Sequence, residues 1–74
     1  MFLNELEPGK TAKITDITDN SNIRRLYDLG IIPGTEIKAL YKAPSGNITA
    51  YLVRGTVFAL RGDTARKIKI DGSD

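Results

Sequence analysis

The sequence contains neither cysteine nor histidine. Without cysteine, the chain has no disulfide framework, no thiol nucleophile and no thiolate metal site. Without histidine, it lacks the usual general base near neutral pH and the commonest ligand for transition metals. Ser21, Ser45 and Ser73 therefore have no histidine to activate them, and no pair of carboxylates falls in a catalytic motif. The sequence predicts a protein that is not an enzyme and holds no cofactor.

Long apolar runs are also missing. The longest unbroken ones, residues 50–53 and 57–60, are far shorter than the roughly 20 residues that a membrane span needs. The acidic stretch 1–7 has no apolar segment of the kind that a signal peptide contains. We therefore expect a cytoplasmic protein that is not inserted in a membrane, and the lack of cysteine agrees with a reducing compartment.

Length and charge limit the remaining classes. With 74 residues, the chain is expected to form a single domain over 1–74, with 71–74 as a frayed tail. Its net charge of +2 would attract the phosphates of a nucleic acid only weakly. Tyr41, Tyr51 and Phe58 lie on predicted strands, where aromatic rings can stack on bases, so a nucleic-acid-binding barrel is one alternative.

Most of the chain has the periodicity of short strands. Alternation and turn residues predict strands over 10–18, 36–42, 48–54, 56–61 and 67–70. Residues expected to share a face are Ala12 with Ile14 and Asp16, Ile37 with Ala39 and Tyr41, Ile48 with Ala50 and Leu52, Tyr51 with Val53, and Ile68 with Ile70. Arg54 and Gly55 are expected to form a tight hairpin turn. Lys67 and Lys69 should point outward and protect an edge strand.

One segment has helical periodicity instead. Ile23, Leu26, Tyr27 and Leu29 form an apolar stripe on a helix at about 21–29, which the polar cluster 19–22 would cap. Gly30 suits the position after the helix end, Pro33 prevents continuation, and Gly34 opens the next strand. A single further helical turn, capped by Asp63, would hold Ala65. Together these elements predict an all-β fold: a small barrel of about five strands with one short helix between the first two.

The helix and its exit carry the candidate binding residues. Ile31 and Ile32 follow the helix at once, and such an excess of apolar groups is typical of an interaction site. We expect Ile23 and one of Leu26 and Leu29 to lie in the core. Leu26 is the first predicted partner contact, followed by Tyr27, Leu29 and Ile32.

Metal binding has little support. Ferrous iron sites usually combine imidazole with carboxylate, and this chain offers carboxylates alone. The candidates are scattered rather than clustered: Asp16, Asp19, Asp28, Glu36 and Asp63. We expect them to be solvated or to cap helices, and a weak surface site for a transition metal ion is the most that they would form.

The segment 25–37, RLYDLGIIPGTEI, resembles the helix-to-strand signature of the ferrous iron transport protein A (FeoA) family. Other parts similar to that family follow in order along the chain: Leu6 with Pro8 and Gly9, the loop 43–47, Val53-Arg54-Gly55, and Phe58 to Arg61 with Ala65. The resemblance covers about 3–70, nearly the whole chain. It implies an SH3-like barrel with an inserted helix.

The resemblance also implies a function. It points to an accessory protein of FeoB, the membrane transporter with a cytoplasmic GTP-binding domain that imports ferrous iron. The same fold occurs as the C-terminal domain of iron-dependent repressors, so a metal-sensing domain is a second alternative. We disfavour it here because Met1 starts the domain and no DNA-binding region precedes it. Whether the protein activates, inhibits or assembles its partner, and whether it weakly self-associates, is left open.

Overall fold

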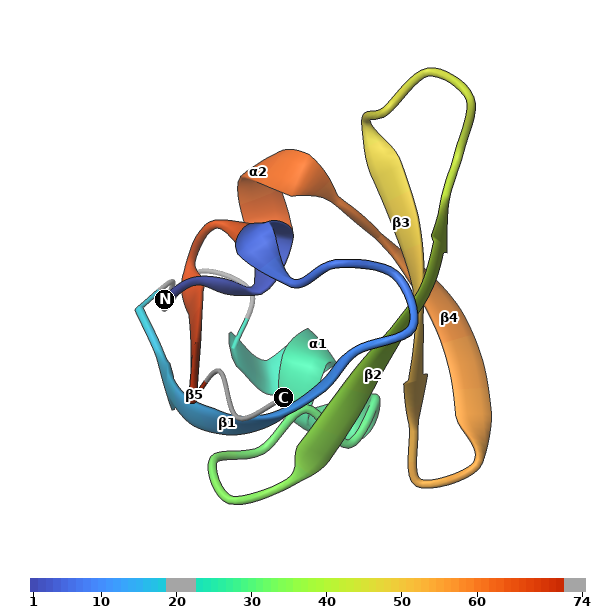
Figure 1. Ribbon diagram of the computed structural model, residues 1–74. Helices are drawn as coiled ribbons and strands as arrows, with labels where there is room; N and C mark the ends of the chain where they lie inside the picture. Colours follow the sequence, from blue (N-terminus) through green and yellow to red (C-terminus); the bar gives the residue numbers. More distant parts are fainter. Residues whose placement is uncertain (19–22, 72–74) are drawn as a thin grey trace.

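A computed structural model describes residues 1–18 and 23–71, which form one strongly bent antiparallel sheet with short helices at its ends (Figure 1). The strand order is β4-β3-β2-β1-β5. The elements in chain order are η1 (Leu3–Glu5), β1 (Thr11–Ile17), α1 (Ile23–Asp28), β2 (Glu36–Lys42), β3 (Ile48–Val53), β4 (Thr56–Arg61), α2 (Gly62–Ala65) and β5 (Ile68–Asp71). The predicted all-β class, with one helix between the first two strands, is confirmed.

Two parts of the prediction fall on undescribed positions. The polar cluster 19–22, expected to cap the helix, lies outside the described residues, as do residues 72–74 of the expected tail. Asp71 belongs to β5, where it pairs with Lys13, so the tail does not begin at this residue.

Two bulges alter the predicted strand faces. The pairing register shifts between Ile14 and Asp16 in β1, and between Ala39 and Tyr41 in β2. An extra residue at a bulge moves every later side chain to the other face of the sheet. Asp16 is therefore exposed and Ile17 is buried. The expectation that Tyr41 shares the face of Ile37 and Ala39 is wrong, because its side chain is 62% exposed.

The core fills the concave side of the sheet. Tyr51 and Val53 of β3 point into it, and Ile68 and Ile70 of β5 do so as predicted. The largest fully buried side chains are Tyr51, Leu3, Ile14, Leu26, Ile31, Ile37, Ile68 and Val53. No helix among the described residues has the length and apolar character needed to cross a membrane.

The turn between β3 and β4 is the tight hairpin that Arg54 and Gly55 predict. Both residues have positive φ, 52° at Arg54 and 81° at Gly55. Positive φ at both central positions is the property of a type I′ turn, whose twist matches that of the two strands. Six consecutive residue pairs then join β3 to β4 without a bulge.

The N-terminal segment covers the open edge of β5. The amide of Ile70 donates to the carbonyl of Met1 at 2.9 Å, and Phe2 forms an isolated bridge with Lys69. The turn η1, which the sequence patterns do not predict, is closed by the Glu5 carboxylate, which accepts the amide of Phe2 at 2.7 Å. The edge of β5, which Lys67 and Lys69 were expected to protect, is thus also partly paired with the N-terminal residues.

The single helical turn around Ala65 is present as α2, and Ala65 is buried. Asp63 is not its N-cap, since Arg61 occupies that position without a side-chain hydrogen bond. Asp63 is the second residue of α2, and its carboxylate accepts the amide of Thr64 at 3.1 Å.

Candidate functional site

The end of α1 is fixed by a compact set of backbone hydrogen bonds. Gly30 has a φ of 91°, as its predicted position after the helix requires. Its amide donates to the carbonyl of Tyr27 at 3.0 Å, and the amide of Ile31 donates to the carbonyl of Leu26 at 2.9 Å. These two bonds define a Schellman motif, in which the residue after glycine contacts the residue that accepts its amide.

This motif corrects the first predicted contact. Leu26 is only 2% exposed and Ile31 is fully buried, so neither is available to a partner in the folded chain. Burial of this pair is the hydrophobic contact that accompanies a Schellman motif. The sequence does contain a signal for this burial. A glycine directly after a helix predicts a Schellman motif, in which the residues at the positions of Leu26 and Ile31 contact each other.

The other predicted contacts remain at the surface to different degrees. Tyr27 is 44% exposed and Ile32 is 38% exposed, whereas Leu29 is half-buried and packs against the core. We call these three residues, Tyr27, Leu29 and Ile32, the helix-exit patch. The exposed charged side chains on the same helix are Arg24, Arg25 and Asp28.

The backbone beneath the helix-exit patch is tied to the sheet. The amide of Gly34 donates to the carbonyl of Ile14 at 2.7 Å, and the amide of Ile14 donates to the carbonyl of Thr35 at 2.9 Å. The amide of Thr35 donates to the carbonyl of Ile32 at 3.0 Å, and Gly34 has a φ of 97°. Pro33 followed by a glycine at positive φ is the pattern of a type II turn. The patch therefore stands on a braced turn rather than on a free loop.

The aromatic residues considered for base stacking do not form one surface. Tyr51 is buried in the core and Phe58 is half-buried against it, so Tyr41 is the one aromatic of the three with an exposed ring. Stacking of successive bases needs several exposed aromatic rings. The structure corrects the expectation for Tyr51.

A second exposed apolar area, which the sequence patterns do not single out, lies on the convex face of the sheet. Tyr41, Ile48 and Val57 are 62%, 40% and 57% exposed. Cross-strand pairing places Tyr41 beside Ala50 and Leu52 beside Val57. The bulge in β2 turns Tyr41 to this face, whereas Ile48 and Val57 reach it through the regular pairing of β3 with β4.

The carboxylates do not gather. In residues 1–18 and 23–71, no three His, Cys, Asp or Glu side chains come together as metal ligands would. Asp16 accepts the amide of Ile17 at 2.8 Å and Asp63 that of Thr64, so both carboxylates have local backbone partners. Asp19 lies outside the described residues.

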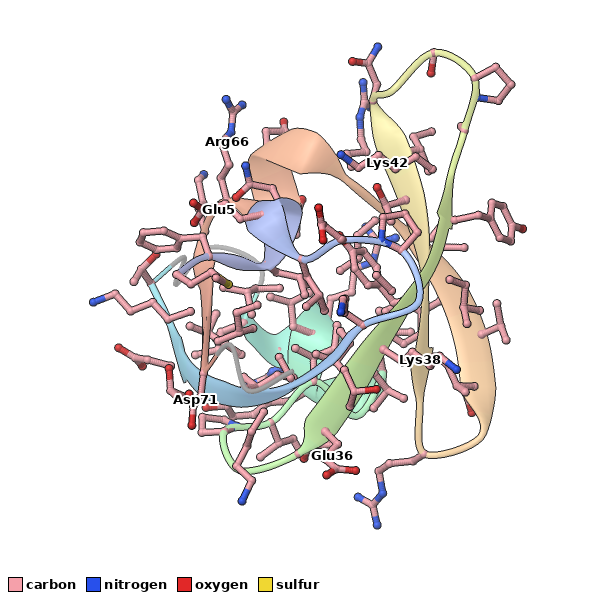
Figure 2. The ribbon with its side chains drawn as sticks, in the orientation of Figure 1. Glu5, Glu36, Lys38, Lys42, Arg66 and Asp71 are labelled. Carbon is pink, nitrogen blue, oxygen red and sulfur yellow. The ribbon has the colours of Figure 1, made fainter. Side chains whose placement is uncertain are left out.

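A groove of about 540 Å³ opens at the end of the barrel that carries α2. Three cationic residues line it, one in β2, one at the end of β4 and one directly after α2: Lys42, Arg61 and Arg66. Figure 2 shows Lys42 and Arg66 at this end of the molecule, with Lys38 and Glu36 further along β2. The sequence patterns do not predict this cationic groove, because its residues are separated along the chain.

Solved structures with the same fold include FeoA proteins. A FeoA-like protein from Clostridium acetobutylicum is 34% identical, with a TM-score of 0.89 over 97% of this chain and 85% of that chain. The FeoA protein of Stenotrophomonas maltophilia, complexed with zinc and described as an SH3 domain protein, is 32% identical. Its TM-score is 0.84, over 96% of this chain and 89% of that chain. The predicted SH3-like fold is thereby confirmed.

Part of a transcriptional repressor shares the fold as well. A manganese-dependent repressor complexed with manganese has a TM-score of 0.88 over 97% of this chain, but over 36% of its own, at 17% identity. No curated protein matches the sequence. The FeoA domain model matches residues 1–71, nearly the whole chain, and the resemblance inferred from the sequence is therefore confirmed. The chain belongs to the FeoA domain family.

Proposed function

We propose that this protein is a non-catalytic accessory of ferrous iron uptake that acts by contact with the cytoplasmic side of a FeoB-like membrane transporter. Family membership supports the link to iron transport. The Stenotrophomonas maltophilia relative is itself described as a bacterial ferrous iron transport activating factor, with the qualification that this is a possibility. A protein that regulates a transporter need not hold the metal, in agreement with a chain that has no histidine or cysteine.

The exposure of Tyr27 and Ile32 on a braced helix end carries the assignment of the contact surface. Aromatic and aliphatic anchors surrounded by charged side chains are the usual anatomy of a modest interface. Here the surrounding charges would come from Arg24, Arg25 and Asp28. Leu29, being half-buried, would contribute its exposed edge.

Regulation by such a contact requires a difference in affinity. A bound protein shifts the conformational or nucleotide-state populations of a transporter only if it binds one state more tightly than another. A rigid patch suits this role, because it fits one arrangement of the partner without adapting to the others.

A pull-down from solubilised membranes tests the proposal. The wild type should retain the transporter, and Tyr27→Ala together with Ile32→Ala should lose it while keeping the thermal midpoint of the wild type. Val57→Ala, which removes an exposed apolar side chain from the convex face, is the matched control and should retain the transporter. Retention by all variants would move the contact away from the helix-exit patch, and retention by none would refute the accessory function.

The metal-sensing alternative rests on the fold shared with the manganese-dependent repressor. A metal sensor should gain thermal stability when ferrous iron or manganese is added. The accessory function expects no such gain at micromolar metal. A nucleic-acid binder would instead show an affinity for oligonucleotides that falls steeply with salt.

A further inference from the structure

The cationic groove is built by three separate pieces of the chain. Lys42 pairs directly with Thr49 across β2 and β3, so the two side chains share one face of the sheet. Tyr51 lies two residues further along β3 on that same face. Arg61 ends β4 and Arg66 follows α2, and both residues line the groove.

The walls of the groove are held together by backbone hydrogen bonds. The amide of Gly62, the first residue of α2, donates to the carbonyl of Asn47 at 2.9 Å. Asn47 lies in the hairpin loop between β2 and β3. The amide of Ala43 closes this loop by donating to the carbonyl of Ile48 at 2.8 Å. The groove is therefore a preformed feature, and a ligand would not have to order it.

The charge of the groove is unbalanced. Three cationic residues line it but only one acidic residue, Asp63, whose carboxylate already accepts the amide of Thr64. Among the described residues, none of Lys42, Arg61 and Arg66 forms an ion pair. A concave site lined mainly by one sign of charge concentrates ligands of the opposite sign.

Two hydroxyl groups lie on the floor of the groove. Burial raises the pKa of the Tyr51 phenol, and a hydrogen bond with Thr49 lowers it by a smaller amount. The phenol thus remains protonated at neutral pH. Neither hydroxyl group therefore adds negative charge to the groove.

The size and chemistry of the groove define a class of ligand. Its volume of about 540 Å³ falls within the range of small-molecule sites, about 300–1,000 Å³, and exceeds the needs of a single inorganic anion. Guanidinium groups bind tetrahedral phosphate through paired hydrogen bonds, and lysine adds a point charge. We propose that this groove binds a small molecule with two or more neighbouring phosphate groups, such as a nucleoside diphosphate, through Lys42, Arg61 and Arg66.

Titration with inorganic pyrophosphate at constant ionic strength, followed by the backbone amide signals in NMR, tests the proposal. Saturable shifts are expected at residues that line the groove, such as Gly46, Thr49 and Gly62. Lys42→Gln should weaken binding about tenfold or more, because it removes a charge-assisted hydrogen bond. Lys38→Gln removes an exposed lysine of the same strand from outside the groove and should leave binding unchanged (Figure 2).

Two competing ligands distinguish the sources of the anion. Citrate tests carboxylates, and a short single-stranded oligonucleotide tests a nucleic-acid backbone. Equal or tighter binding of either one would overturn the assignment to a small phosphorylated molecule. Non-saturating shifts, or equal losses in Lys42→Gln and Lys38→Gln, would show diffuse attraction only. Arg66→Gln, at an exposed position after α2, provides a second variant if Lys42→Gln alters the fold.

Discussion

The Ile31 amide lies 2.9 Å from the carbonyl oxygen of Leu26, and both side chains belong to the same buried cluster. The bond spans one residue more than an ordinary helical bond because Gly30, between the two, has a positive φ. One glycine therefore determines which side chains of the helix enter the core and which remain at the surface.

Leu26→Ala should lower the free energy of unfolding by about 2–5 kcal/mol, because it removes buried methyl groups and leaves a cavity. Chemical denaturation with urea measures the change. Tyr27→Ala, at the next position on the same helix and half-exposed, should cost much less. Similar losses in both variants would contradict the burial of Leu26.

Gly30→Ala should lower the free energy of unfolding by about 1–2 kcal/mol, the cost of a left-handed conformation in a residue with a Cβ atom. An added Cβ would lie 3.6 Å from Cγ1 of Val53, an ordinary contact, so the backbone conformation is the source of the loss. Gly62→Ala is the control, since its Cβ would meet nothing closer than the Asn47 carbonyl oxygen at 3.8 Å. That variant should be neutral or more stable, as alanine favours a helix. Thermal unfolding of the two proteins side by side gives the answer.

Arg54→Asn should raise the free energy of unfolding by about 0.5–1 kcal/mol. Arg54 has a φ of 52°, and asparagine followed by glycine is the preferred pair for a type I′ turn. Arg54→Val should act in the opposite direction, because a β-branched residue at positive φ is strained. A pair of denaturation curves that move the same way would argue against the type I′ turn.

Tyr51 should make stability depend on pH in the alkaline range. Burial raises its pKa above the ordinary tyrosine value of 10.0, with a smaller opposing effect from a hydrogen bond with Thr49. As the pH rises past 10, the phenol ionises first in the unfolded chain, which then binds fewer protons than the folded chain. The stabilisation is thus complete below pH 10 and is lost as the pH rises toward the folded pKa.

The measurement compares Tyr51→Phe with the wild type between pH 8 and pH 11. The wild type should lose stability more steeply than the variant at the upper end of this range. Tyr41→Phe changes a largely exposed tyrosine and should follow the wild-type curve. Parallel curves for all three proteins would show that the Tyr51 phenol is not desolvated.

The strands are predictable from sequence where a clear turn bounds them. β2 and β4 have their predicted bounds, because Gly34 and Gly55 mark where each begins and Pro44 and Gly62 follow soon after each ends. The bulges are not predictable from alternation. They lie in the pairing of β1 with β5 and of β2 with β3, and depend on how each strand bends to pair with two neighbours, which only the folded sheet determines.

The candidate site is predictable in part. The glycines at positions 30, 34 and 55 have the positive φ that their turns require, and the surface exposure of Tyr27 and Ile32 follows the expectation. Leu26 is buried instead of exposed. Helical periodicity alone does not predict this, because Ile31 folds back onto Leu26 only after the helix has ended. The groove depends on Lys42, Arg61 and Arg66, which lie in different elements and come together only in the fold, so no local sequence pattern predicts it.

The pairing of β1 with β5 has a consequence for biosynthesis. Ile14 and Ile17 of the first strand find their partners, Ile70 and Ile68, only after almost the whole described chain has been made. The carbonyl of Met1 likewise waits for the amide of Ile70. On the ribosome, the hairpins from β2 to β4 can form early, whereas the first strand remains unpaired along one edge until translation reaches Asp71. Closure of the sheet therefore waits for β5, and a nascent chain stalled before β5 would expose the apolar residues of β1 to chaperones.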